Sequence, residues 1–246
     1  MCIRDRTMLE VVADRGGASA RDLAEALEVP LPSIYRLARE LVDADYLTHV
    51  RSEGRYELGH KLHLLGLSLH RQVGLSRPVT AEISRLHEAT GMAAYLAILR
   101  GGEMVVVHVI DSPACPRLTP MRFGFHEAPH ATAFGKLLLA DVAPAERADY
   151  LNRHQLVALT AHTITEVAEL DRHLSVVARR GIAWEFGEFR PGWDCAAVPV
   201  RAGDNRLLGA VAISVQAGRI RGRETAVESA LRQVASRVSA LLRSGK

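Results

Sequence analysis

The order of helical and strand-like patterns at the start of this chain is the feature that most constrains its fold. Three short helical patterns lie between residues 7 and 42, and two strand patterns separated by a Gly-containing turn follow them. In the third helical pattern the apolar positions are Ile34, Leu37, Ala38 and Leu41, at the spacing of one helix face. Three helices followed by a hairpin are typical of a winged helix-turn-helix.

Residues that start and stop helices mark the boundaries of these elements. Gly16 is a stop signal for the first helix. Ser19 is a good N-cap for the second helix, with Asp22 three residues later, and Pro32 suits the first turn of the third. Residues 1–6 have no pattern that joins the first helix, so we expect that helix to begin after them.

A longer helix is predicted after the hairpin. The hairpin strands are expected at residues 46–50 and 56–58, around a turn that contains Gly54. Leucines four, three and four residues apart then form a heptad-like seam on a helix that runs to about Val73: Leu58, Leu62, Leu65 and Leu69. We interpret this helix as both a linker and a dimer contact.

The rest of the chain predicts an antiparallel sheet with helices packed around it, which is an α+β domain. Strands are expected at residues 92–100, 104–110, about 118–123, 182–189, 196–201 and 207–215. Helices are expected at residues 79–89, 131–139, 144–151, 166–180 and 223–242. The predicted domains are therefore a winged helix-turn-helix over 1–58, a linker helix over 59–77 and an α+β domain over 78–246.

Composition and charge exclude some classes of protein. The hydrophobic content of 48% is that of a folded protein, and no apolar run approaches the roughly 20 residues of a membrane helix. Three widely spaced cysteines fit neither a disulfide framework nor a paired metal site, so we expect a cytoplasmic protein. His126 and His130 lack a third ligand at convincing spacing, and no metal or other cofactor is predicted.

The third helix and the hairpin carry the candidate DNA contacts. Two of these lie at the hairpin turn and the others on the outward face of the helix: Ser33, Tyr35, Arg36, Arg39, Arg51 and Arg55. The net charge of +3 permits a nucleic-acid partner without requiring one. Residues 1–77 carry 11 basic and 11 acidic side chains, so a positive face depends on placement. The alternative is that these cations are merely solvated.

Four stretches resemble one known family. ARDLAEALEVPLPSIYRLARELVDADYL and GRYELG, within residues 18–59, are similar to the DNA-binding domain of the IclR family of transcriptional regulators. HATAFGKLLLA from His130, EFRPGWDCAAVPV from Glu188 and LLGAVAIS from Leu207 resemble its effector domain, in the same order. The sequence departs from the family at Glu28, where glycine is usual, at Phe134, where a small residue is common, and at Ala212, where serine is typical.

The resemblance implies a GAF-like sensor domain with a pocket between the sheet and the loop that enters the HATAFGK helix. The pocket residues that it implies are Ala133, Phe134, Glu185, Cys195, Ala212 and Ser214, and Met121 is added as an apolar wall. A helix N-terminus beside such a pocket suits a carboxylate ligand. Ordinary core packing is the alternative explanation for each of these positions.

The predicted function is a ligand-responsive transcriptional regulator, repressor or activator, of a catabolic operon. Its expected partners are a palindromic operator in double-stranded DNA, a small organic or aromatic acid, and a second copy of the chain, with a dimer of dimers left open. Two alternatives are an enzyme that uses Cys195 or Glu185 and an architectural DNA-binding protein. No partner base for Cys195 is recognisable in the sequence, so we expect no enzymatic activity.

Overall fold

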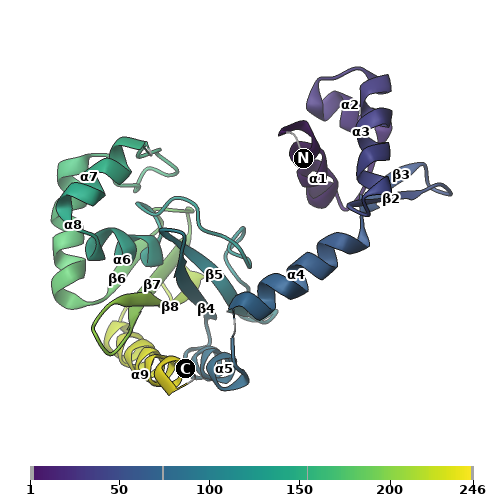
Figure 1. Cartoon of the computed structure of the whole chain (residues 1–246). Coiled ribbons are helices and arrows are strands. Elements are labelled where there is room, and N and C mark those ends of the chain that lie inside the picture. Colours follow the sequence, from purple (N-terminus) through teal and green to yellow (C-terminus); the bar gives the residue numbers. More distant parts are fainter. Residues whose placement is uncertain (1–2, 74, 154, 245–246) are drawn as a thin grey trace. The chain divides into compact units, whose positions relative to one another are not determined.

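The computed structural model describes residues 3–73, 75–153 and 155–244, and it divides into two compact units, Met1–Leu75 and Ser76–Lys246 (Figure 1). The first unit includes the long helix that the sequence analysis treated as a separate linker. Its elements in chain order are α1 (Ile3–Arg15), β1 (Ala18–Ser19), α2 (Ala20–Leu27), α3 (Leu31–Asp43), β2 (Leu47–Val50), β3 (Arg55–Leu58) and α4 (His60–Val73).

The first unit is a three-helix core closed by a small antiparallel sheet in the order β1-β3-β2. The stripe of α3, with Ile34 and Ala38 fully buried, packs on Met8 and Leu23 of α1 and α2. The two-residue strand β1, which pairs Ala18 with Tyr56, was not predicted. This unit confirms the predicted helix-turn-helix with its hairpin.

Local capping explains where the second helix begins and ends. Ser19 Oγ accepts a hydrogen bond from the Asp22 N–H at 3.2 Å, and Asp22 Oδ2 accepts one from the Ser19 N–H at 2.9 Å. This reciprocal pair confirms the predicted N-cap. At the other end Glu28 adopts the left-handed conformation, with φ of 54°, at the turn where the family usually has glycine.

The prediction that the first helix begins after residue 6 is wrong. Helix α1 begins at Ile3, and residues 1–2 lie outside the described part of the chain. Asp5 lies in the first turn, where an acidic side chain stabilises the helix N-terminus, and Thr7 Oγ1 donates to the Ile3 carbonyl. Polar side chains can therefore extend the helix without an apolar stripe.

The second unit is a five-stranded antiparallel sheet in the order β5-β4-β8-β7-β6, with helices on both faces (Figure 1). One face of the sheet is covered by α5 and α9, the first and last helices of the unit. The other face is covered by α6, and α8 packs against α6. The elements are α5 (Arg77–Thr90), β4 (Ala93–Arg100), β5 (Glu103–Ile110), α6 (Ala133–Asp141), α7 (Pro144–Arg153), α8 (Val167–Arg180), β6 (Ala183–Phe186), β7 (Trp193–Arg201), β8 (Leu207–Gln216) and α9 (Glu224–Ser244). This is the predicted α+β architecture.

Two strand predictions are wrong in this unit. Residues 118–123 form a loop rather than a strand, because Pro120 has no N–H to donate and the loop is anchored instead by its buried side chains Leu118 and Met121. Strand β6 ends at Phe186 rather than at residue 189. Gly187 adopts a φ of 68° and donates its N–H to the Trp193 carbonyl at 2.7 Å, which turns the chain out of the strand.

Candidate functional site

Helix α3 presents a polar face to solvent, opposite its buried stripe. Tyr35 is 54% exposed, Arg36 and Arg39 are exposed, and Ser33 is half-buried in the first turn. The Arg39 guanidinium lies 3.8 Å from the Asp43 carboxylate, with both side chains largely in solvent. Among the described residues no carboxylate pairs with Arg36, so this arginine is available to a phosphate or a base edge.

The hairpin holds its two arginines differently. Arg51 begins the turn and is exposed. Arg55, in contrast, lies between two carboxylates: its Nε is 2.9 Å from Glu53 Oε2, and its Nη2 is 2.6 Å from Glu57 Oε1. The two acidic groups neutralise the Arg55 charge, so of the predicted hairpin cations Arg51 is the better placed to meet a phosphate.

Cross-strand pairing brings several predicted pocket residues of the second unit together. The register sets Glu185 of β6 opposite Cys195 of β7, and Cys195 opposite Ser214 of β8. All the predicted positions are at most 3% exposed: Met121, Ala133, Phe134, Glu185, Cys195, Ala212 and Ser214. Phe134 stacks edge-to-face on Phe125 at 6.1 Å within the same core. The apolar members of the set therefore pack as core.

Glu185 is the acidic member of this set, and its side chain is fully buried. Its Oε1 accepts hydrogen bonds from the backbone N–H groups of Glu188 and Phe189, while Oε2 has no hydrogen-bond partner among the described residues. Burial raises the pKa of Glu185 and raises the pKa of the neighbouring Cys195 thiol well above its ordinary value. Cys195 therefore stays a protonated thiol, which is the opposite of what a nucleophile needs.

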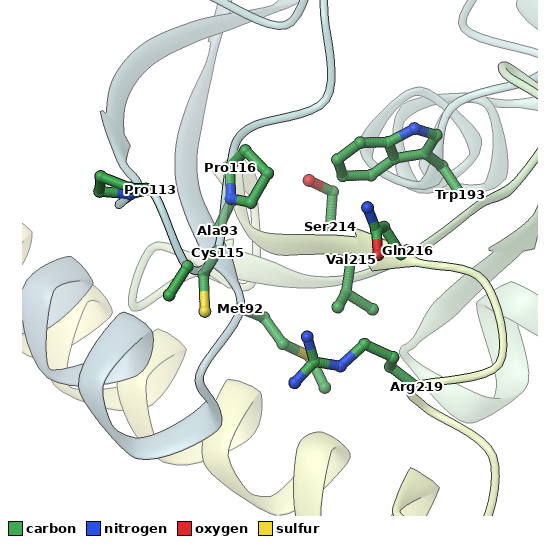
Figure 2. A pocket seen from close by; sticks show the side chains of 11 residues that line it. Met92, Ala93, Pro113, Cys115, Pro116, Trp193, Ser214, Val215, Gln216 and Arg219 are labelled. Atoms are coloured by element: carbon green, nitrogen blue, oxygen red, sulfur yellow. The ribbon is translucent and has the colours of Figure 1, made fainter.

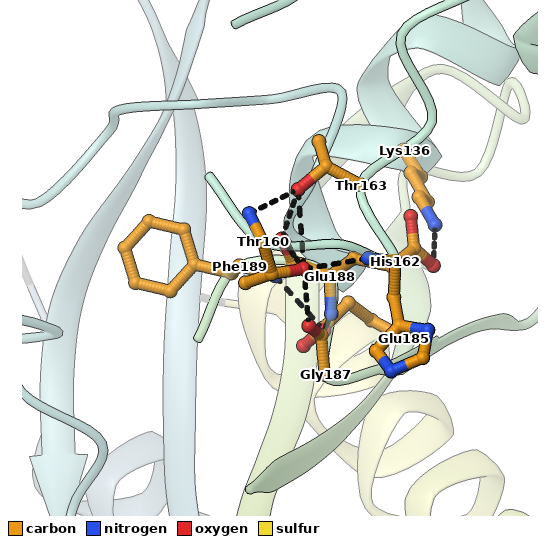
Figure 3. Close-up of polar contacts among 8 residues, drawn as sticks. All are labelled: Lys136, Thr160, His162, Thr163, Glu185, Gly187, Glu188 and Phe189. Carbon is orange, nitrogen blue, oxygen red and sulfur yellow. Dashed lines mark hydrogen bonds and ion pairs between the residues drawn. The ribbon is translucent and has the colours of Figure 1, made fainter. Parts of the chain in front are cut away.

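A buried ion pair, which the sequence analysis missed, anchors the turn after β6 (Figure 3). Lys136 of α6 is fully buried, and its Nζ pairs with Glu188 Oε1. Thr163 Oγ1 donates to the Glu188 carbonyl at 2.6 Å, and Thr160 Oγ1 donates to the Gly187 carbonyl at 2.7 Å. Burial lowers the pKa of Lys136, and the facing Glu188 carboxylate opposes that shift.

A second buried polar pair, also missed, lies next to the predicted pocket. The Tyr95 hydroxyl of β4 lies 2.7 Å from Ser214 Oγ and accepts a hydrogen bond from the Leu118 N–H at 3.0 Å. Burial raises the pKa of Tyr95, so the phenol remains protonated. The pair links the sheet to the loop between β5 and α6.

A cavity of about 150 Å³ opens beside Ser214 (Figure 2). Its walls come from the start of β4, the loop after β5, the start of β7 and the end of β8: Met92, Ala93, Pro113, Ala114, Cys115, Pro116, Trp193, Ser214, Val215, Gln216 and Arg219. Ser214 is the predicted ligand residue that lines it. Trp193, Cys115 and Arg219 were missed, because the three segments that carry them are far apart in the sequence.

The leucine seam of α4 is mostly in solvent. The prediction that Leu58 belongs to this helix is wrong, because Leu58 ends β3 and α4 begins only at His60. Leu58, Leu65 and Leu69 are exposed, whereas Leu62 packs against the core of the first unit. Leu64 and Leu67 are exposed as well, so the apolar surface is wider than the predicted seam.

In the described part of the chain, no group of three or more His, Cys, Asp or Glu side chains could hold a metal ion. No described helix is both long and apolar enough to cross a membrane.

Comparisons with known proteins agree with both halves of this description. The family model for the IclR helix-turn-helix domain matches residues 7–51, and that for the C-terminal domain of bacterial transcriptional regulator IclR matches residues 70–240. The probable transcriptional regulator SauR of Cupriavidus necator is 27% identical over 89% of this chain and 86% of its own length.

Solved structures show the same fold. The IclR crystal structure from Thermotoga maritima aligns with a TM-score of 0.77 at 24% identity, covering 97% of each chain. An IclR homologue from Microbacterium hydrocarbonoxydans, complexed with 4-hydroxybenzoate, aligns with a TM-score of 0.78 at 22% identity and covers 96% of each chain. The relatives are named as transcriptional regulators rather than enzymes. From its two matched domains, the chain belongs to the IclR family of bacterial transcriptional regulators.

Proposed function

We propose that this regulator controls a catabolic operon, binds a palindromic operator as a homodimer and responds to a small organic or aromatic acid. The observation that carries the proposal is the exposed face of α3, where Arg36 has no carboxylate partner among the described residues. Such a face can enter the major groove while its buried stripe fixes the helix on the domain. The site of action would be the cytoplasm, where the DNA lies.

The exposed leucines of α4 support the dimer. Leu65 and Leu69 are four residues apart on one helix face, and Leu58 precedes them at the end of β3. A second copy of the same helix could cover this apolar surface in a self-complementary contact. Two winged domains held in this way would read half-sites about 34–36 Å apart, one turn of DNA.

The effector domain would hold the acid near the buried set around Cys195 and Ser214. The helix N-terminus at Ala133 and the strands β7 and β8 supply the polar groups that such a ligand needs. The 4-hydroxybenzoate complex of the Microbacterium homologue makes hydroxybenzoates a reasonable first class to screen. Binding would favour one of two pre-existing arrangements of the dimer and so change operator affinity.

The test is fluorescence anisotropy with DNA fragments that flank the gene. We expect the dimer to prefer one such fragment over a random duplex of the same length at moderate salt. Addition of the cognate acid should change that affinity in either direction, because release and recruitment are both compatible with the proposal. Equal affinity for every fragment and for the random duplex would refute the proposal.

A further inference from the structure

The start of α4 is seated on the turn that follows α3, within the first unit (Figure 1). The Gly59 N–H donates to the Tyr46 carbonyl at 2.8 Å, and the Lys61 N–H donates to the Asp45 carbonyl at 3.1 Å. Asp45 adopts the left-handed conformation, with φ of 60°, as the chain turns out of α3. Two backbone hydrogen bonds therefore join the end of the candidate recognition helix to the helix that carries the exposed leucines.

Gly59 makes this junction closer than any other residue would allow. A Cβ atom at this position would overlap the Asp45 carbonyl oxygen and would lie 2.7 Å from the Tyr46 carbonyl carbon, which is closer than such atoms approach one another. Both obstacles are backbone atoms, so neither can rotate away as a flexible side chain could. The two backbone segments therefore pack directly against each other.

Side chains brace the same junction. The Lys61 Nζ lies over the Tyr46 ring, 5.0 Å from its centroid, in a cation–π contact. Leu62 and Tyr46 also pack against the buried core of the first unit. Backbone, cationic and apolar contacts at its first turn thus restrain α4 from swinging relative to α3.

We infer that the contacts of Gly59, Lys61 and Tyr46 form a rigid joint that sets the spacing of the half-sites in the operator. The inference rests on the proposed function, in which two copies pair through α4 and each places α3 in the major groove. Because the joint fixes the angle between α3 and α4, it also fixes the distance between the two recognition helices of the dimer. Lys61 and Tyr46 are then positioning residues rather than DNA contacts.

Half-site spacing is a stringent measure of such a joint. One extra base pair between the half-sites moves them apart by about 3.4 Å and turns one of them by about 35° around the DNA axis. A dimer with rigid joints cannot follow this rotation, so one half-site loses its base contacts. A dimer with loosened joints can follow it in part.

In vitro selection from a random duplex library supplies the DNA probe. The full-length wild-type protein should select a palindrome, from which duplexes with one base pair more or one fewer between the half-sites are made. In fluorescence anisotropy we expect the wild type to bind each altered duplex at least about tenfold more weakly, because the contacts of one half-site are lost. This ratio of affinities is the spacing penalty.

Two variants loosen the joint from its two sides. Lys61→Met and Tyr46→Leu should each reduce the spacing penalty by a factor of about two to five, which is the contribution of an exposed cation–π contact. Lys61→Arg keeps a cation over the ring and should retain the wild-type penalty. If Lys61 instead contacted a phosphate, its removal would weaken binding at every spacing equally, and Tyr46→Leu would have no effect.

A matched pair of glycine substitutions tests the close approach. Gly59→Ala should lower the affinity for the selected palindrome at least about tenfold, while binding to a duplex with a single intact half-site stays unchanged. Gly66→Ala, in the same helix, is the control, because a Cβ atom there meets nothing within 4 Å. Circular dichroism and sedimentation velocity check that each variant is folded and dimeric.

The outcomes separate this inference from the proposed function. Equal wild-type affinity across the spacing series would overturn the inference, as would variants of Lys61 and Tyr46 that keep the full penalty. Equal behaviour of the two glycine variants would overturn it as well. Each of these results leaves the regulator proposal intact, because the palindrome has still been selected. Selection of no palindrome would refute the proposed function, and the inference with it.

Discussion

Tyr95 and Ser214, 119 residues apart in the chain, share a hydrogen bond of 2.7 Å in the interior of the second unit. The same Tyr95 hydroxyl accepts the Leu118 N–H, so one phenol oxygen joins β4, β8 and the loop between β5 and α6. The floor of the Ser214 cavity therefore depends on a side chain outside its lining.

The Tyr95→Phe substitution should lower the free energy of unfolding by about 1–3 kcal/mol, because it leaves the buried Leu118 N–H and Ser214 hydroxyl without their partner. Urea denaturation followed by circular dichroism measures the change. Tyr35→Phe is the matched control, since Tyr35 is exposed on α3 and should alter stability little. Equal effects of the two substitutions would contradict this role for the phenol.

Loss of the Arg36 side chain should weaken operator binding while effector binding persists. The Arg36→Ala substitution removes an exposed cation of α3 that can reach phosphate or base, so we expect a loss of about 1–3 kcal/mol in binding free energy. Fluorescence anisotropy with labelled operator DNA measures this loss of affinity. Arg172→Ala, which removes an exposed arginine from α8 of the other unit, is the control. A loss of effector affinity in the Arg36 variant would argue against separate modules.

Two substitutions in the buried set should change the effector response and leave the DNA affinity of the free protein near normal. Ser214→Ala removes a hydroxyl donor, and Phe134→Ala enlarges the space beside Phe125. Phe134→Leu accompanies them, because full truncation of a buried phenylalanine costs about 3–5 kcal/mol and could unfold the domain. Titration of operator complexes with acids measures the response. Variants that lose both activities equally would contradict the prediction.

Removal of Lys136 should be severely destabilising. The Lys136→Met substitution leaves Glu188 buried without its cation, for which we expect a loss of about 3–5 kcal/mol in the free energy of unfolding. The exposed pair of Arg6 and Glu10, at 3.7 Å, is the control, and Arg6→Met should cost at most about 1 kcal/mol. A small effect of Lys136→Met in urea denaturation would show that the pair contributes little.

His173 should make the protein less stable in weak acid. Burial, with a smaller contribution from the charge of Lys136, lowers the pKa of His173 from 6.5 to about 4. Between these values the unfolded chain binds a proton that the folded chain does not, so stability falls as pH decreases through this window. We expect His173→Gln to reduce the loss of unfolding free energy between pH 7 and pH 5. Identical losses in both proteins would rule out this contribution.

Local patterns predicted most of the first unit. The Ser19 and Asp22 capping pair and the stripe around Ile34 each involve residues within one or two helical turns, so the sequence contains the whole signal. The loop that contains Leu118 was misread as a strand, because its apolar residues are buried by contacts with distant strands rather than by pairing in the sheet. Helix α1 was predicted too short for lack of an apolar pattern.

Long-range pairs in the candidate site could not be predicted in this way. Lys136 and Glu188 are 52 residues apart, and nothing near Glu188 points to its partner. One signal was present: Lys136 is the only charge within the stretch AFGKLLLA, and a lone cation within a run of apolar residues indicates a buried counter-ion. For Arg219 the sequence offered no comparable signal.

The carboxylates that enclose Arg55 affect how strongly ionic strength should control operator affinity. A cation already compensated by Glu53 and Glu57 displaces few condensed counterions from DNA, and it must give up those contacts before it can reach the backbone. A tally of basic residues on the helix and hairpin therefore overstates the steepness of the salt dependence. The hairpin of β2 and β3 therefore adds little net positive charge to the DNA-binding surface. Discrimination between DNA sites depends mainly on α3, the helix that would enter the groove.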